Sequence, residues 1–328
     1  MGSYDLVIDG GTTNLRVALL NEEGIVMAAS KKEAGVSHTA IDGHNGRLKE
    51  AVGDAIKELM AEYHLCPADI ARCVAYGMIT SREGLVEIPH LTAPADAPAL
   101  RRGMVRKSFP EIAPFPIAFI PGVKNNVDAA LLDSFASMDM MRGEETEAVG
   151  LWSLLRPTGP GVFVLPGSHN KLIKMGEDGQ ILGCRTVMSG ELLSALTRHT
   201  LLAGSVGQSF ATLETYDREM ALRGYHEAEA SGLGRAAFAG RILSTLYQQP
   251  PDKVASYLLG AVTQTDAAAL KAFTGTDAPI YIAGREPVKT ALCDIFQAAG
   301  FSAVHPVAEE ISSRMGLAGA LRIAEVDF

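Results

Sequence analysis

The chain has 328 residues, of which 47% are hydrophobic and 20% charged, and its formal net charge is -9. This composition is ordinary for a globular protein with a sizeable core, and the length suits two domains of about 150 residues each. The negative charge and the lack of a basic stripe argue against nucleic-acid binding. No apolar run approaches the roughly 20 residues needed to span a bilayer, so no membrane partner is expected. Because the four cysteines form no CxxC pair and no leader sequence precedes the first strand, we expect a cytoplasmic protein with reduced thiols.

The first eighty residues alternate between short apolar runs and turns. Strands are predicted from Tyr4 to Ile8, from Leu15 to Leu20 and from Ile25 to Ala29. Apolar residues at helical spacing predict a helix from Arg47 to Tyr63, followed by a strand from Cys73 to Tyr76. Three strands, a helix and a further strand are typical of the opening of a ribonuclease-H-like sheet.

The second half repeats this opening after a Pro/Gly cluster at residues 156–161. Its predicted strands run from Gly161 to Leu165, from Lys171 to Met175 and from Ile181 onward. The loop of residues 11–14 superposes on the loop of residues 167–170 at nearly the same offset as the hairpin glycines Gly24 and Gly179. Few folds duplicate a hairpin and its loop in this way, so the repeat predicts two related domains. Two alternating halves with chance similarity are the alternative.

The rest of the second half is mainly helical. Helices are predicted over Leu192–Leu202, Leu233–Gln248, Pro251–Phe273, Pro287–Ala298 and Glu309–Val326, with a strand over Ile280–Ala283. Gly316 and Gly319 lie inside the last helix, where each glycine costs about 0.5–1 kcal/mol relative to alanine. We therefore expect close packing of this helix against another helix at a hinge.

The segment from Asp9 to Asn14 lies between two predicted strands and carries the main chemical signal. Glycines there let the backbone bend and direct N–H groups at an anion, and Thr12 and Thr13 add hydroxyl donors. Asp9 can hold Mg²⁺ through water, as that ion prefers. The alternative is a glycine-rich hairpin turn with solvated threonines. The matching loop at residues 167–170 favours a pair of loops that hold a polyphosphate.

Other nucleotide motifs narrow the choice. The sequence has no GxxxxGK[ST] motif, so a P-loop is not supported. Gly284 follows the strand over Ile280–Ala283, where a glycine turn lets a purine lie against the backbone; a plain strand-to-helix connection is the alternative. The predicted phosphate and ATP ligands are Asp9, Gly11, Thr12, Thr13, Asn14, Gly167, Ser168, His169, Lys171 and Gly284. A hydrogen-bonded His169 without a ligand role is left open, and no His/Cys/Asp cluster has the spacing of a structural metal site.

The order and spacing of several short segments resemble the 2-dehydro-3-deoxygalactonokinase family across nearly the whole chain. These segments are Asp9–Arg16, Tyr76–Gly84, Ile120–Gly122, Met141–Thr146, Leu165–Lys171 and Met188–Glu191. The family usually has Trp where this chain has Gly10, Thr in place of Ser168 and Ser189, and Ser in place of Asn170. The last three are exchanges between polar residues, whereas Gly10 removes a bulky ring and calls the local packing into question.

The resemblance implies an α/β protein of the actin-like ATPase or hexokinase-like fold, with two ribonuclease-H-like domains and an interdomain cleft. Residues 1–155 would form the domain with the first phosphate loop and the sugar-acid site, and residues 156–328 the domain with the second loop and the adenosine site. The implied reaction is ATP- and Mg²⁺-dependent phosphorylation of the C6 hydroxyl of 2-dehydro-3-deoxy-D-galactonate, in galactonate catabolism. We expect the two lobes to close over the substrates and exclude water.

A kinase of this kind needs a carboxylate base for the attacking hydroxyl. The position of Met141–Thr146 before a predicted helix is similar to where related sugar kinases place theirs, which makes Glu144 the first candidate. Asp139 and Glu145 are the next candidates. An adjacent Glu pair that merely favours the helix dipole is the alternative, and it is stronger for Glu145.

The sugar acid also needs a partner for its carboxylate. Arg82, beside Ser81 in a hydroxyl-rich stretch, has the planar fork that suits a carboxylate. Arg142 and Arg16 are alternative substrate ligands. Arg82 could instead form a surface salt bridge with Glu83 or Glu87.

Three other functions compete with this one. The nearest is a kinase for another 2-keto-3-deoxy sugar acid or a hexuronate, because phosphate motifs are shared among such enzymes. An actin- or chaperone-like ATPase would carry long inserted subdomains, for which the chain has no room. A transcriptional regulator would need a helix-turn-helix before the first strand, which begins at Tyr4. The sequence does not fix the oligomeric state, and a homodimer is compatible with it.

Overall fold

The structure is a computed structural model that describes residues 3–325. The chain divides into two compact units, the first formed by residues up to 158 with 177–183 and the segment from 314 on, the second by 159–176 and 184–313. This division differs from the continuous domains 1–155 and 156–328 that the sequence predicts. The difference arises because two later segments of the chain pack with the first unit.

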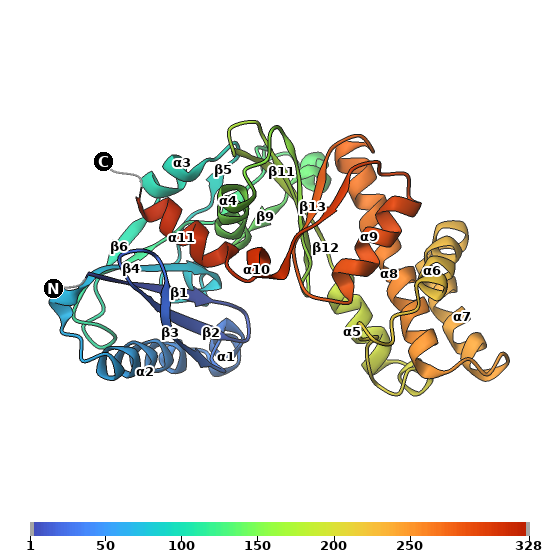
Figure 1. Cartoon of the computed structure of the whole chain (residues 1–328), viewed down its shortest axis with the longest axis horizontal. Helices are drawn as coiled ribbons and strands as arrows, with labels where there is room; N and C mark the ends of the chain where they lie inside the picture. Colours follow the sequence, from blue (N-terminus) through green and yellow to red (C-terminus); the bar gives the residue numbers. More distant parts are fainter. Residues whose placement is uncertain (1–2, 326–328) are drawn as a thin grey trace. The chain divides into compact units, whose positions relative to one another are not determined.

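The sheet of the first unit has six strands (Figure 1). In spatial order they are β3 (Val26–Lys32), β2 (Leu15–Leu20), β1 (Tyr4–Gly10), β4 (Ile70–Gly77), β7 (Ile117–Phe119) and β6 (Val105–Lys107). Strand β1 pairs antiparallel with β2 and parallel with β4. Helix α2 (Gly46–Glu62) presents its apolar stripe to this sheet, and Leu48, Val52 and Ile56 join the core around Ile8.

Helices α4 (Glu144–Leu155) and α11 (Met315–Glu325) also belong to the first unit. They pack closely because glycine stands at the contact: a Cβ at Gly150 would collide with the carbonyl oxygen of Met315, and one at Gly319 with that of Thr146. A Cβ at Gly316 would collide with the hydroxyl of Tyr76. The predicted close packing of the last helix is confirmed, and it explains why α11 lies with the first unit.

Smaller elements complete the first unit, and the sequence analysis did not predict them. They are α1 (Val36–Asp42), α3 (Ala97–Arg102), the 3-10 helices η1 (Pro67–Asp69), η2 (Met78–Thr80) and η3 (Leu132–Ser137), and a sheet of β5 (Leu91–Thr92), β8 (Val123–Lys124) and β9 (Met140–Met141). Residues 177–183 dock here through two backbone hydrogen bonds of 2.8 and 3.0 Å between Ile181 and Ala95. Gly179 lies against the ring of Trp152.

The sheet of the second unit repeats the strand order of the first. Its strands are β12 (Ile181–Val187), β11 (Asn170–Met175), β10 (Gly161–Leu165), β13 (Ile280–Ile282) and β14 (Val304–Pro306). The order β12-β11-β10-β13-β14 corresponds to β3-β2-β1-β4-β7, with the same antiparallel and parallel pairings of the central strand. The predicted structural repeat is therefore confirmed.

Helices make up the remainder of the second unit (Figure 1). They are α5 (Ser189–His199), the 3-10 helix η4 (Ala203–Ser205), α6 (Arg218–Ser231), α7 (Leu233–Thr245), α8 (Pro251–Thr274), α9 (Val288–Ala298) and α10 (Glu309–Ser312). Helix α6 was not predicted. The predicted helix over Glu309–Val326 is two helices, α10 and α11, and Val326 lies outside the described residues.

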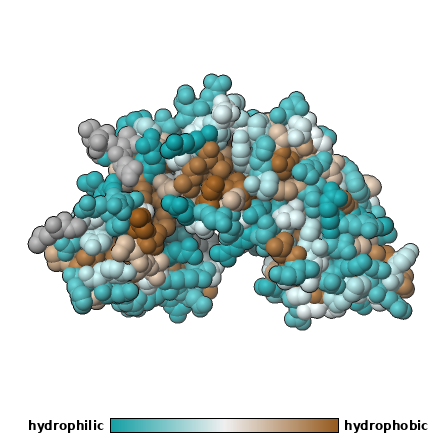
Figure 2. Space-filling view, viewed as in Figure 1, coloured by the Kyte–Doolittle hydropathy of each residue, from teal (hydrophilic) through white to brown (hydrophobic). Residues whose placement is uncertain are grey.

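Within residues 3–325, no helix is long and apolar enough to cross a bilayer. Figure 2 shows a mainly hydrophilic face on which apolar side chains gather in separate patches. None of the four cysteines forms a disulfide within residues 3–325, and Cys73 and Cys184 are buried.

Candidate active site

The first predicted phosphate loop connects β1 and β2. The N–H of Gly11 donates to the carbonyl oxygen of Asn14 at 2.9 Å, which closes the turn. The N–H of Ser37, near the start of α1, donates to the carbonyl oxygen of Thr12 at 2.9 Å. The side chains of Thr12, Thr13 and Asn14 are exposed. The loop backbone is thus fixed from inside the unit, while its hydroxyl and amide side chains remain available to a ligand.

Asp9 stands in a row of polar side chains across three strands. In the sheet register it lies opposite Arg16 on β2 and Tyr76 on β4. Burial raises the pKa of Asp9, while the charge of Arg16 and a hydrogen bond from Tyr76 lower it. The pKa of Tyr76 is itself raised well above its usual range, mainly by burial. Asp9 is therefore a partly buried oxygen donor whose negative charge is only partly compensated by protein groups.

Gly10 is explained by its neighbour on the next segment. A Cβ at this position would lie 2.5 Å from the Cβ of Ile79, which is fully buried in η2. Ile79 occupies the space that a side chain at position 10 would need. A larger residue here requires η2 to move, so the packing at Gly10 is close without a ring.

The predicted base Glu144 begins helix α4, directly after a turn at Gly143. Gly143 has φ +117°, a conformation that glycine adopts readily. Both carboxylate oxygens of Glu145 accept the N–H of Gly143, at 2.9 and 2.8 Å, and Glu145 is 0% exposed. Glu144 is partly exposed and accepts the N–H of Arg142 at 3.0 Å. Of this pair, Glu144 is accessible and Glu145 supports the turn.

Asp139, another predicted base, lies just before β9. Its carboxylate accepts the N–H of Met140 at 2.7 Å, and its backbone carbonyl accepts the N–H of Asn125 at 2.8 Å. The side chain is partly exposed. Asp139 is thus hydrogen-bonded within the small sheet of β5, β8 and β9 and belongs to a different element from Glu144.

Glu147 is a neighbour of this site that the sequence analysis missed. Its pKa is raised well above the usual range by burial and by the charges of Glu144, Asp9 and Glu145, in that order. Burial, followed by the charge of Glu144, also raises the pKa of Glu145 to about 7. Glu144 and Glu147 are three residues apart and so lie on one helix face, and this spacing could have indicated Glu147 from the sequence. The carboxyl groups of Asp9, Glu144, Glu145 and Glu147 thus form one group of interacting charges, and Arg16 lowers the pKa of Asp9 among them.

The predicted substrate arginines have different surroundings. Nη1 of Arg142 donates to the carbonyl oxygen and the hydroxyl of Thr80, both at 2.7 Å, and Nη2 donates to the carbonyl oxygen of Ile88 at 3.0 Å. Arg142 therefore uses its fork to hold the segment between Thr80 and Ile88. Arg16 is exposed and lies opposite Asp9.

Arg82 is exposed, and within residues 3–325 its side chain forms no hydrogen bond or ion pair. The alternative of a salt bridge to Glu83 or Glu87 is thus not found in the described structure. Ser81 is buried, and its hydroxyl donates to Glu83 at 3.4 Å. Arg82 is thus a predicted substrate arginine whose guanidinium group is free within the described residues.

The second predicted loop, between β10 and β11, is held differently from the first. The N–H of Gly167 donates to the side-chain oxygen of Asn170 at 3.0 Å, and the side-chain nitrogen of Asn170 donates to Asp266 at 2.9 Å. The carbonyl oxygen of Ser168 accepts the N–H of Glu191 at 2.9 Å. Gly167, Ser168 and His169 are exposed.

Two basic residues of this loop region already have partners. Nε2 of His169 lies 2.7 Å from the carboxylate of Glu191. Lys171 is buried, and its Nζ donates to the hydroxyl of Thr186 on β12 at 2.6 Å. His169 is exposed beside the loop, whereas Lys171 lies within the sheet.

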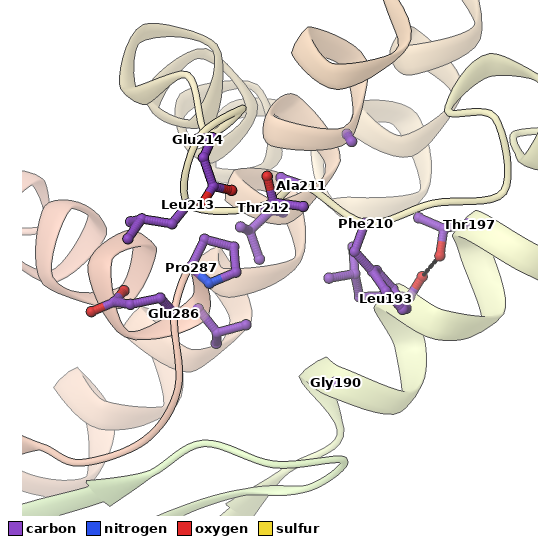
Figure 3. Close-up of a pocket in the computed structure, with 13 residues that line it drawn as sticks. Gly190, Leu193, Thr197, Phe210, Ala211, Thr212, Leu213, Glu214, Glu286 and Pro287 are labelled. Carbon is purple, nitrogen blue, oxygen red and sulfur yellow. Dashed lines mark hydrogen bonds between the residues drawn. The ribbon is translucent and has the colours of Figure 1, made fainter. Parts of the chain in front are cut away.

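A pocket of about 470 Å³ lies within the second unit (Figure 3). In Figure 3, Leu193 and Phe210 stand on one side and Glu286 and Pro287 on the other. Gly190 also lines the pocket, and a Cβ there would collide with the carbonyl oxygen of Gly167. The pocket therefore begins beside the second loop. Its volume lies within the range of about 300–1,000 Å³ that small-molecule sites occupy.

Gly284 joins the same region. Its φ is +149°, and a Cβ there would lie 2.5 Å from Cγ of Pro166, the residue before Gly167. The predicted glycine turn after β13 thus packs against the second loop. The hydroxyl of Thr197, one of the few polar side chains on the pocket wall, donates to the carbonyl oxygen of Leu193 at 2.7 Å. The pocket presents mainly apolar surface.

Comparison with known proteins identifies the family. The family model described as 2-keto-3-deoxy-galactonokinase matches residues 9–320. The chain belongs to this kinase family. The resemblance found in the sequence is therefore confirmed, and the matched range includes both loops, α4 and the pocket.

Named relatives agree with this assignment. A protein of Rhizobium meliloti (strain 1021) named as a 2-dehydro-3-deoxygalactonokinase is 29% identical over 218 residues, 63% of this chain and 60% of the relative. The chain thus spans less than two thirds of that relative. The 2-dehydro-3-deoxygalactonokinase of Escherichia coli (strain K12) is 25% identical over 295 residues, 90% of each chain.

Solved structures confirm the fold. A protein from Sinorhizobium meliloti described as a 2-dehydro-3-deoxygalactonokinase has a TM-score of 0.77 and 22% identity, and covers 99% of this chain and 100% of its own. The activator of 2-hydroxyisocaproyl-CoA dehydratase from Clostridium difficile, solved with ADPNP, has a TM-score of 0.50 and 12% identity, covering 98% of this chain and 94% of its own. The predicted actin-like ATPase fold is correct.

Proposed function

We propose that this kinase transfers the γ-phosphoryl group of ATP to the C6 hydroxyl of 2-dehydro-3-deoxy-D-galactonate, in cytoplasmic galactonate catabolism. The observation that carries the proposal is the family match over residues 9–320. The names of the relatives from Rhizobium meliloti and Escherichia coli support the same substrate. A kinase for another 2-keto-3-deoxy sugar acid or a hexuronate is the second candidate.

In this proposal the pocket of the second unit binds adenosine. Leu193, Phe210 and Pro287 supply apolar surface for the base. Gly190 connects the pocket to the second loop, so a nucleotide whose base enters the pocket would direct its phosphates toward Gly167 and Ser168. The exposed Thr12 and Thr13 of the first loop are further phosphate ligands in this proposal.

Asp9 fits the requirements for Mg²⁺. It supplies a hard carboxylate oxygen, and the raised pKa values of Asp9 and of Glu147 indicate that the surrounding protein groups do not offset the cost of charging these carboxyl groups. Mg²⁺ usually keeps several waters and needs only one or two protein carboxylates. When bound, the ion would neutralise charge on the phosphates during transfer.

Glu144 is the proposed base. Its partly exposed carboxylate would take the proton of the sugar hydroxyl while the hydroxyl oxygen bonds to the γ-phosphorus and the bond to ADP breaks. Glu145 fixes the turn before Glu144 through the N–H of Gly143. Arg82, with its free guanidinium, would bind the carboxylate of the sugar acid.

The test is a coupled assay of ADP release over a panel of 2-keto-3-deoxy sugar acids and hexuronates, with neutral sugars as controls. The proposal expects the highest kcat/KM with 2-dehydro-3-deoxy-D-galactonate and a product phosphorylated at C6. A higher kcat/KM with another acid would favour the second candidate. ATP hydrolysis that no sugar acid stimulates would instead support a non-kinase ATPase.

A further inference from the structure

A chain of hydrogen bonds leads from the second loop into the interior of the second unit. The N–H of Gly167 donates to Asn170 at 3.0 Å, and the amide nitrogen of Asn170 donates to Oδ1 of Asp266 at 2.9 Å. Asn170 is 1% exposed and Asp266, on α8, is 0% exposed. The first loop closes differently, with a backbone carbonyl of Asn14 as the acceptor. Of the two loops, only the second is therefore closed by a hydrogen bond to a buried side chain.

Burial of the Asp266 side chain is energetically unfavourable. Its Oδ2 is buried and has no hydrogen-bond partner within the described part of the chain. Burial raises its pKa to about 6, and the neighbouring side chains of Ser189 and Asn170 offset only part of that rise. A buried carboxylate with one oxygen unpaired destabilises the folded state, so fold stability alone does not account for it.

The same carboxyl group lies at the junction of the loop and the pocket. Ser189, the first residue of α5, is 2% exposed, and its hydroxyl lies 3.5 Å from that of Thr265, the neighbour of Asp266 on α8. The next residue, Gly190, contacts the carbonyl oxygen of Gly167 and lines the pocket. Asp266 therefore links α8 to β11 beside the first turn of α5.

We propose that Asp266 is a positioning residue for the nucleotide: through Asn170 it fixes the N–H of Gly167 in the second loop. This inference rests on the proposed function of the second loop as a phosphate site. A phosphate oxygen gains most from N–H groups that are already oriented before binding. Loss of the hydrogen bond between Asn170 and Asp266 would free the loop and weaken nucleotide binding, while the affinity for the sugar acid would stay unchanged.

The experiment compares Asp266→Ala with Asp266→Asn. Alanine removes the acceptor for Asn170, whereas asparagine keeps one carbonyl oxygen for it. We expect Asp266→Ala to raise KM for ATP roughly tenfold, as the loss of one oriented hydrogen bond would, with KM for the sugar acid changed less than twofold. Asp266→Asn should restore most of the ATP affinity.

Thr263→Ala is the matched control on the same helix. Thr263 is 1% exposed, and its hydroxyl bonds to the carbonyl oxygens of Leu259 and Gly260 within α8. This variant loses a buried hydroxyl but should keep the wild-type KM for ATP. Calorimetric titration with ADP and thermal unfolding are measured for every variant, so that affinity is read only from folded protein.

The outcomes separate the two proposals. Equal increases in both KM values, or a loss of thermal stability with unchanged ADP affinity in Asp266→Ala, would assign Asp266 a purely structural role and overturn this inference. If Asp266→Ala does not fold, an unchanged ADP affinity in Asn170→Ala would overturn it equally. A wild-type chain that binds neither ATP nor ADP would overturn the proposed function together with it.

Discussion

Glu145 and Gly143 are joined by two hydrogen bonds, because the N–H of Gly143 lies 2.9 and 2.8 Å from the two carboxylate oxygens of Glu145. This contact holds the turn that precedes Glu144. Glu145 thus supports the backbone beside the proposed base. Its raised pKa should therefore affect the stability of the protein more directly than it affects the phosphoryl transfer.

The free energy of unfolding should depend on pH through Glu145. Its pKa is about 7 in the folded chain, against an ordinary value of 4.5, so the folded state binds the proton more tightly than the unfolded state. The buried charge then costs nothing below pH 4.5, and a penalty of about 3 kcal/mol develops as the pH rises through 7. In Glu145→Gln the penalty is absent. Urea unfolding should show the variant gaining stability relative to wild type between pH 5 and 8, and a constant difference would contradict the assignment.

Replacement of the proposed base should affect turnover rather than nucleotide binding. Glu144→Gln is expected to lower kcat by about 10²–10⁴-fold, the usual contribution of a general base. ADP affinity should remain within twofold. Glu219→Gln on α6 is the control, since Glu219 is exposed and pairs only with Arg223 among the described residues. A Glu144→Gln enzyme with normal kcat would contradict the assignment of Glu144 as the base.

The strands and loops could be predicted because their signals are local. Strands at Leu15–Leu20 and Gly161–Leu165 have the predicted bounds, since glycine turns and apolar runs mark their ends. Helix α6 was not predicted because its sequence is mainly polar and shows no clear apolar stripe. It packs on α8 where Gly224 meets the carbonyl oxygen of Tyr257, a contact that only the folded chain creates.

The candidate site, too, could be predicted from the sequence only in part. The residues of the first loop were predicted from glycine and threonine next to Asp9. Tyr76 could not be placed beside Asp9 without the register of β1 and β4. The burial of Glu145 and the link from Asn170 to Asp266 depend on packing between segments far apart in the sequence. Short-range motifs thus indicate ligand loops, whereas the groups that support them require the fold.

The free guanidinium of Arg82 should determine affinity for the sugar acid. A hydrogen-bonded ion pair with the substrate carboxylate contributes about 1.5–3 kcal/mol, so Arg82→Ala should raise KM for the sugar acid roughly 10- to 100-fold. KM for ATP should stay unchanged. Arg82→Lys should recover part of the loss, because it keeps the charge without the planar fork. Arg223→Ala, which removes an exposed arginine paired with Glu219, is the control. A raised KM for ATP instead would place Arg82 at the nucleotide.

The contact between Gly10 and Ile79 can be tested by a double-mutant cycle. Gly10→Ala should destabilise the protein by about 1–3 kcal/mol, because the new Cβ would lie 2.5 Å from the Cβ of Ile79. Replacing Ile79, which is 0% exposed, with glycine removes its Cβ together with the rest of the side chain and should cost at least about 2–5 kcal/mol by leaving a cavity. If the Ile79 side chain is what excludes a side chain at position 10, Gly10→Ala should cost less when residue 79 is already glycine, by at least about 0.5 kcal/mol in urea unfolding. Strictly additive costs would show that the backbone of η2, and not the Ile79 side chain, imposes glycine at this position.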